Sequence, residues 1–106
     1  MAARYHAFVD GIAWAESAMV AARTRLEIAT ENLANVSTAG FRPIAARGSL
    51  SAVGVTIARE RAGGGVDAIA QMIDVLAAER SFESAQKTVG AIDATRQKSA
   101  EAARVA

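Results

Sequence analysis

Apolar residues recur along the first third of the chain at steps that alternate three and four. The positions are Tyr5, Phe8, Ile12, Ala15, Met19, Ala22, Leu26, Ala29, Leu33 and Val36. This 3.5-residue period is typical of a helix that packs along one seam against a partner helix. The pattern predicts a helix from about Tyr5 to about Val36. At about 1.5 Å per residue it would be roughly 45–50 Å long, so a chain this small covers it only with a second long helix.

A second series of apolar residues at steps of three and four runs through the last third of the chain. Its positions are Met72, Val75, Ala78, Phe82, Ala85, Val89, Ile92 and Arg96, with a second apolar edge at Ile69, Ile73 and Leu76. This series predicts a helix over about Val66–Arg104, with Asp67 as a first-turn acid that favours the helix dipole. Glu83 and Lys87 have the spacing of a favourable ion pair. Near the C-terminus the seam turns polar, so the last turns should fray in the free chain.

The middle segment, residues 42–65, interrupts both helical patterns. Pro43, Gly48 and Gly54 punctuate it, and three glycines end it. Alternation over Val53–Ile57 predicts a short strand, and Arg47–Ser51 is the candidate partner strand of a marginal hairpin. We therefore expect a mainly α fold of one structural domain. Its three segments are 1–41 with the first helix, 42–65 with the loop or β-hairpin, and 66–106 with the second helix.

Composition changes this picture by predicting a thin core. The 52% hydrophobic content is carried largely by alanine, and aromatics make up only 5%. Alanine favours helix but buries little area, so we expect stability to come from association. The net charge of +1 gives no reason to expect binding to nucleic acid or to an anionic membrane. The absence of cysteine excludes disulfides and thiolate metal sites.

The sequence predicts neither a membrane span nor a signal peptide. No stretch approaches about 18 consecutive strongly apolar residues, so we predict no membrane span. Polar residues interrupt any apolar region near the N-terminus, so we predict no signal peptide.

Residues 29–41 end the first helix with residues that favour a turn. The segment reads Ala-Thr-Glu-Asn-Leu-Ala-Asn-Val-Ser-Thr-Ala-Gly-Phe. Gly40 adopts positive φ at little steric cost. The hydroxyls of Ser37 and Thr38, or the Asn35 amide, can bond the freed backbone groups. Phe41 can then fold back onto the helix, at Leu33 or Val36.

Asn32 and Asn35 lie three residues apart on one face of the predicted helix. Their amides allow two interpretations. They either belong to an ordinary helix stop, or they bond to a neighbouring subunit and fix its register, as a polar residue in an apolar seam does.

The same segment resembles the signature of the bacterial flagellar axial proteins, the rod, hook and hook-associated subunits. In that family it commonly reads Ala-x-Asn-Asn-(Leu/Ile)-Ala-Asn-(Val/Ala)-(Asn/Ser)-Thr-x-Gly-(Phe/Tyr). The matching residues here are Ala29, Asn32, Leu33, Ala34, Asn35, Val36, Ser37, Thr38, Gly40 and Phe41. Glu31 stands where the family has asparagine.

The second helix also resembles that of the family. The matching residues are Val66, Asp67, Met72, Ile73, Leu76, Ala77, Ala78, Glu79, Arg80, Ser81, Phe82, Glu83, Ser84 and Ala85. The Arg-x-aromatic-Glu core at Arg80–Glu83 is intact, whereas Ala85 stands where the family often has asparagine. The apolar C-terminal end usual in the family is missing here.

The resemblance implies that the two terminal helices form an antiparallel coiled-coil hairpin, and that many subunits pack helically into a hollow tube. The short middle segment is most like that of a small proximal-rod protein. The implied partners are copies of the chain, other rod and axial proteins, and the type III export apparatus. The implied location is the periplasmic rod of the flagellar basal body, reached without a cleaved signal peptide.

We therefore expect assembly surfaces in both matching segments. In the first they are Leu26, Asn32, Leu33, Asn35, Val36, Gly40 and Phe41, and in the second Met72, Ile73, Leu76, Arg80, Phe82 and Glu83. No Ser/His/Asp set, paired-carboxylate cleft or metal spacing is present, so we predict no enzyme, cofactor or metal site. His6 reads as a solvated residue. Trp14 either packs against the middle segment or contacts an adjacent subunit.

The same two seams are also compatible with a different class of protein. A cytoplasmic helical-hairpin adaptor, or a chaperone-like binding module, would use them to dimerise or to hold a partner helix. Such a module should be helical and cooperative alone, whereas a rod subunit should be partly disordered before assembly. The arginines of the middle segment lack the aromatic interleaving of nucleic-acid sites, so a solvated or subunit-facing surface fits them better.

Overall fold

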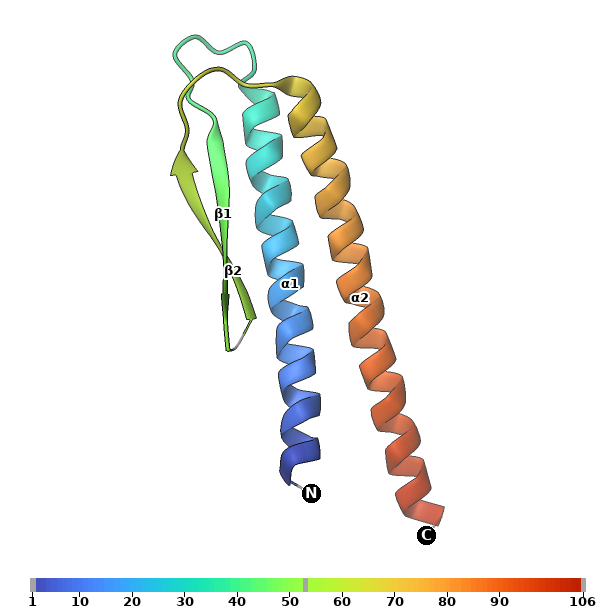
Figure 1. Ribbon diagram of the computed structural model, residues 1–106. Coiled ribbons are helices and arrows are strands. Elements are labelled where there is room, and N and C mark those ends of the chain that lie inside the picture. The colour runs from blue at the N-terminus through green and yellow to red at the C-terminus, as the bar shows by residue number, and fades with distance from the viewer. Residues whose placement is uncertain (1, 53, 106) are drawn as a thin grey trace.

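The structure of the protein is a computed structural model that describes the backbone of residues 2–52 and 54–105 and the side chains of residues 11–52 and 54–104. The elements in chain order are α1 (Ala2–Ala34), β1 (Ile44–Ser51), β2 (Gly54–Arg61) and α2 (Ala68–Val105). The fold is mainly α, as predicted. The two helices run antiparallel, side by side, with the N-terminal end of α1 and the C-terminal end of α2 together (Figure 1). The molecule measures 67 × 22 × 13 Å.

Four residues used in the sequence analysis lie outside the described side chains. They are Tyr5, His6, Phe8 and Val53.

The helices pack through most of the two predicted seams, but Val36, Met72 and Arg96, which the seams included, are exposed. The buried apolar residues among those described are Ala15, Ala21, Ala22, Ile28, Ala29, Ile44, Ala78 and Ala85. Leu26 and Phe82, the larger residues along the seam, are only half-buried. Because alanine contributes little apolar area, the interface between the helices is thin, as the composition indicated.

The helix ends differ from the predicted ones by a few residues. Helix α1 begins at Ala2, before the predicted Tyr5, and ends at Ala34, because a turn follows at residues 35–37. Helix α2 begins at Ala68. Asp67 is its N-cap and not a first-turn acid: its Oδ1 accepts the backbone N–H groups of residues 69 and 70 at 3.1 and 3.2 Å, which satisfies two of the free donors at a helix start.

The hairpin is longer than the sequence indicated. The strands pair antiparallel from Ile44 opposite Arg61 to Ser51 opposite Gly54, so both predicted strands extend away from the turn. The additional residues are mainly Ala, Arg and Glu, which have low β-propensity. Contacts with α1, described below, compensate for that weakness.

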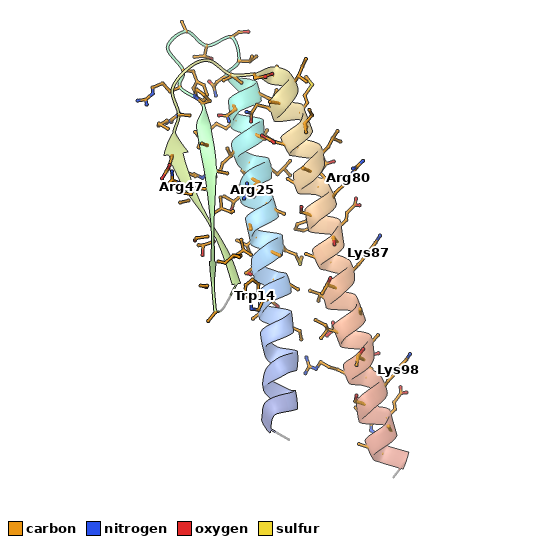
Figure 2. The ribbon with its side chains drawn as sticks, in the orientation of Figure 1. Trp14, Arg25, Arg47, Arg80, Lys87 and Lys98 are labelled. Carbon is orange, nitrogen blue, oxygen red and sulfur yellow. The ribbon has the colours of Figure 1, made fainter. Side chains whose placement is uncertain are left out.

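The hairpin lies against α1 alone. Trp14, Ala21 and Ile28 form an apolar stripe at seven-residue spacing beside the seam of α1. Ala21 and Ile28 are buried, and near the turn Val55 N–H donates to Ser17 Oγ at 3.0 Å. Within the described residues no Cα atom of the hairpin lies within 8 Å of a Cα atom of α2, and β1 and α2 border a shared pocket of about 600 Å³. Trp14, the third residue of the stripe, is half-buried near the turn end of the hairpin (Figure 2).

Candidate assembly surface

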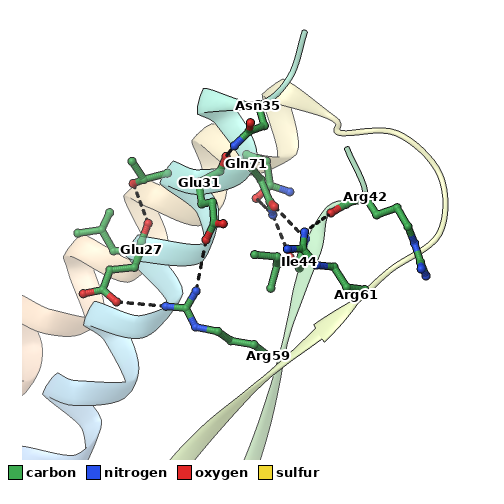
Figure 3. Close-up of polar contacts among 11 residues, drawn as sticks. Glu27, Glu31, Asn35, Arg42, Ile44, Arg59, Arg61 and Gln71 are labelled. Carbon is green, nitrogen blue, oxygen red and sulfur yellow. Dashed lines mark hydrogen bonds and ion pairs between the residues drawn. The ribbon is translucent and has the colours of Figure 1, made fainter. Parts of the chain in front are cut away.

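Asn32 lies at the meeting point of α1, β1 and α2. Its Oδ1 accepts the backbone N–H of Ile44 at 2.8 Å, and its Nδ2 donates to the Ile44 carbonyl at 2.9 Å and to Gln71 Oε1 at 3.2 Å (Figure 3). The residue is only 1% exposed. A buried amide needs partners for these groups, and all of them come from the chain itself. Of the two interpretations of this amide, the contacts within the chain favour a residue that closes the end of the helix.

The remaining helix-end residues close the turn between α1 and β1. Asn35 Nδ2 donates to the carbonyl of residue 31 at 2.9 Å, and Thr38 Oγ1 lies 3.1 Å from Asn35 Oδ1. Gly40 has φ of 77°, so the predicted positive φ is confirmed. Phe41 lies under the Arg61 guanidinium, whose Cζ is 5.4 Å from the ring centroid, a cation–π geometry. The contact of Phe41 with Leu33 or Val36 stays a prediction.

Glu31, the departure from the family signature, pairs with the hairpin. Arg59 of β2 lies 3.4 Å from Glu31 and 3.2 Å from Glu27, and Glu27 also pairs with Arg23 at 3.3 Å (Figure 3). Arg59, Glu27 and Glu31 are about half exposed and Arg23 is mostly exposed, so each pair contributes at most about 1 kcal/mol. These ion pairs join residues of one chain, so Arg23, Arg59, Glu27 and Glu31 have partners within the subunit.

Helix α2 carries an unpartnered apolar face, here called the outer strip. It consists of Ile69, Met72, Ile73 and Leu76, which are between 55% and 71% exposed. Their spacing of i, i+3, i+4 and i+7 is that of a helix face which packs on a partner. Met72, Ile73 and Leu76 were predicted assembly residues. Ile69 was not, although the same spacing identifies it.

The other predicted assembly residues divide between the inside and the outside of the molecule. Leu26 and Phe82 line a groove of about 460 Å³ between α1 and α2, and Leu33 is half-buried. Val36 is 47% exposed. Arg80 is exposed and, like Lys87 and Lys98, points away from α1 (Figure 2).

The predicted ion pair between Glu83 and Lys87 does not form. Both residues are exposed, and the ion pairs among the described side chains lie within α1 and the hairpin or join those two elements. The charges of α2 therefore stay available to solvent or to partners.

These features define an elongated helical-hairpin structural protein with one apolar helix face unpartnered. Over residues 2–52 and 54–105, neither helix combines the length and the apolar content that a membrane span requires. In the same part of the chain, no three His, Cys, Asp or Glu residues are grouped so that they could hold a metal ion.

Comparison with known families identifies the family of this chain. A family model described as "Flagella basal body rod protein" matches residues 12–42, and one described as "Flagellar basal body rod FlgEFG protein C-terminal" matches residues 63–102. Together these segments cover more than half of the 106 residues. The chain belongs to the flagellar rod and axial protein family, and its role is structural. A search of curated proteins found no match.

Proposed function

We propose that this protein polymerises helically, through α1 and α2, into the hollow axial tube of the flagellar basal-body rod. The outer strip carries this proposal, because it lies inside the segment that matches the rod C-terminal family. Contiguous large apolar side chains at helical spacing mark a surface that another chain covers. A neighbouring rod subunit is the partner that the family indicates.

The proposed contacts divide the predicted assembly residues into two groups. The residues that touch a neighbour are Val36, Ile69, Met72, Ile73, Leu76, Arg80 and Glu83, all exposed. The residues that shape the subunit are Leu26, Asn32, Leu33, Asn35, Gly40, Phe41 and Phe82. The first group supplies apolar area and charge, and the second holds α1, the hairpin and α2 in position.

We further propose a proximal position in the rod. The support is the small middle segment, which contains one two-stranded hairpin between the two helices. As a rod subunit the chain would be a substrate of the flagellar type III export apparatus and would reside in the periplasmic part of the basal body. Copies of itself and adjacent rod proteins would be its partners.

The test compares basal bodies purified from wild type and from a strain that lacks this gene, by electron microscopy and mass spectrometry. Missing or truncated rods in the mutant, restored by the wild-type gene, are expected, with the protein present in wild-type basal bodies. Intact rods in the mutant, from basal bodies that never contained the protein, would refute the proposal. That result would favour the cytoplasmic adaptor.

A further inference from the structure

The seam between α1 and α2 repeats itself along the helices. Alanines lie at every seventh residue on α1, at Ala15, Ala22 and Ala29, and on α2 at Ala78 and Ala85, and all five are buried. Sliding α2 by seven residues, about 10.5 Å, again places alanine against alanine at one of these two positions, and Gln71 or Ile92 takes the other. The apolar contacts of the seam alone therefore favour the observed register only weakly over one in which α2 is shifted by a heptad.

The larger residues of the seam do little to remove this ambiguity. Val75, Phe82 and Val89 also recur every seven residues, so a heptad shift exchanges one apolar side chain for another. Phe82 is the bulkiest, yet it borders an open groove of about 460 Å³ and is only half-buried. A side chain in a loose site fixes register less firmly than one in a close-packed socket.

One polar contact distinguishes the observed register. Ile44 binds both the oxygen and the nitrogen of the Asn32 amide, which leaves one Nδ2 proton directed at Gln71. Among the described residues this is the one hydrogen bond between a side chain of α1 and a side chain of α2. A heptad shift would put Ala78 or Gly64 in place of Gln71, and the proton would be left unpaired at a buried site.

We propose that Asn32 and Gln71 set the axial register in which α2 packs on α1. Leaving a buried donor unpaired disfavours the shifted arrangements by roughly ten- to a hundredfold. A buried polar residue fixes register in the same way in coiled coils. Asn32 and Gln71 are thus positioning residues, which fix the position of the outer strip along the helix axis relative to the hairpin.

The absence of cysteine in the chain allows the register to be measured by disulfide cross-linking. A Cβ added at Gly11 would lie 3.4 Å from Ile92 Cδ1, so G11C with I92C reports the observed register. G11C with A85C, or with S99C, reports a shift of one heptad in either direction. In the observed register those pairs are separated by about 10.5 Å along the helices, beyond the reach of a disulfide.

Each cysteine pair is combined with Gln71→Leu, with Gln71→Glu, and with Gln97→Leu as a matched control at an exposed site on α2. Oxidation is carried out with trimethylamine N-oxide present, which favours the packed state. Gln71→Leu should raise the ratio of shifted to observed cross-links by roughly ten- to a hundredfold. Gln71→Glu keeps an acceptor oxygen and should preserve the observed cross-link, as should the control.

Circular dichroism of every variant checks that helix content is retained, and Gln71→Ala replaces Gln71→Leu if that variant unfolds. A Gln71→Leu protein that cross-links like the Gln97→Leu control would overturn the proposal. So would the lack of a Gly11–Ile92 cross-link in the chain with wild-type Gln71.

Discussion

At the scale of single residues, the segment between α1 and β1 depends on one backbone conformation and two side-chain amides. The positive φ of Gly40 follows from turn chemistry visible within four residues of sequence. The hydrogen-bond partners of Asn32 could not be predicted from nearby sequence, because they lie 12 and 39 residues further along the chain. The sequence shows that a buried amide needs partners, but the fold decides which groups these are.

Gly40→Val should destabilise the subunit and impair assembly. A Cβ at Gly40 meets no atom within 4 Å, so the cost arises from the left-handed backbone alone and should be about 1–2 kcal/mol. Urea unfolding of the purified protein measures the loss, and basal-body content measures assembly. Gly63→Val is the control, because Gly63 is equally open but does not have a positive φ. Equal stability of the two variants would contradict the argument.

At the scale of elements, the hairpin is held to α1 at both of its ends. Asn32 binds Ile44 at the start of β1, and Ser17 binds Val55 beside the turn. Heptad spacing alone predicted both helices, because a seam repeats over many turns. The full strands were not predictable in this way, since Ala45, Ala46 and Ala58–Arg61 have little β-propensity and pair only because α1 supports them.

Gly54→Ala should release the turn end of the hairpin. Gly54 has φ of 144°, and an added Cβ would collide with the Ser17 side chain. Hydrogen exchange should show lost protection at the Val55 amide and retained protection at the Ile44 amide, 2.8 Å from Asn32 Oδ1. Gly65→Ala, at an open site, should leave both amides unchanged. Unaltered protection at Val55 in the Gly54 variant would be inconsistent with this docking.

Ile73→Lys should separate folding from assembly. Ile73 is 60% exposed on the outer strip, so the free chain should change in stability by no more than about 0.5 kcal/mol. A lysine in a buried interface between subunits carries an unpaired charge, so the variant should be lost from purified basal bodies. Gln97→Lys, at an exposed polar position on the same helix, should assemble normally. Normal incorporation of Ile73→Lys would remove the outer strip from the interface.

At the scale of the whole molecule, a long, narrow shape and an alanine-rich seam leave little apolar area to stabilise the free chain. The side chains of residues 93–104 are all exposed, so the last turns of α2 have helical backbone but no packing. The polar character of this end was visible in the sequence. We expect stability to fall from the hairpin end of the molecule toward the two termini.

Hydrogen exchange of the free protein tests this gradient. Amides near Asn32 should exchange slowest, and those of residues 93–105 should exchange close to the rate of an unfolded peptide, because local opening there costs little. The exchange should slow in the C-terminal turns once the protein is assembled. Uniform protection along α2 in the free chain would contradict the gradient and would favour a protein that folds fully alone.

The one-sided placement of the hairpin has a consequence for the tube that we propose. Because the hairpin covers α1 and leaves α2 bare, the two long flanks of the molecule differ: the hairpin forms one and α2 forms the other (Figure 1). Subunits joined head to tail through two different flanks are rotated by a fixed angle at each contact, so a row of them closes into a ring or winds into a helix. That angle would then set the curvature of the tube wall and, with it, the bore of the channel.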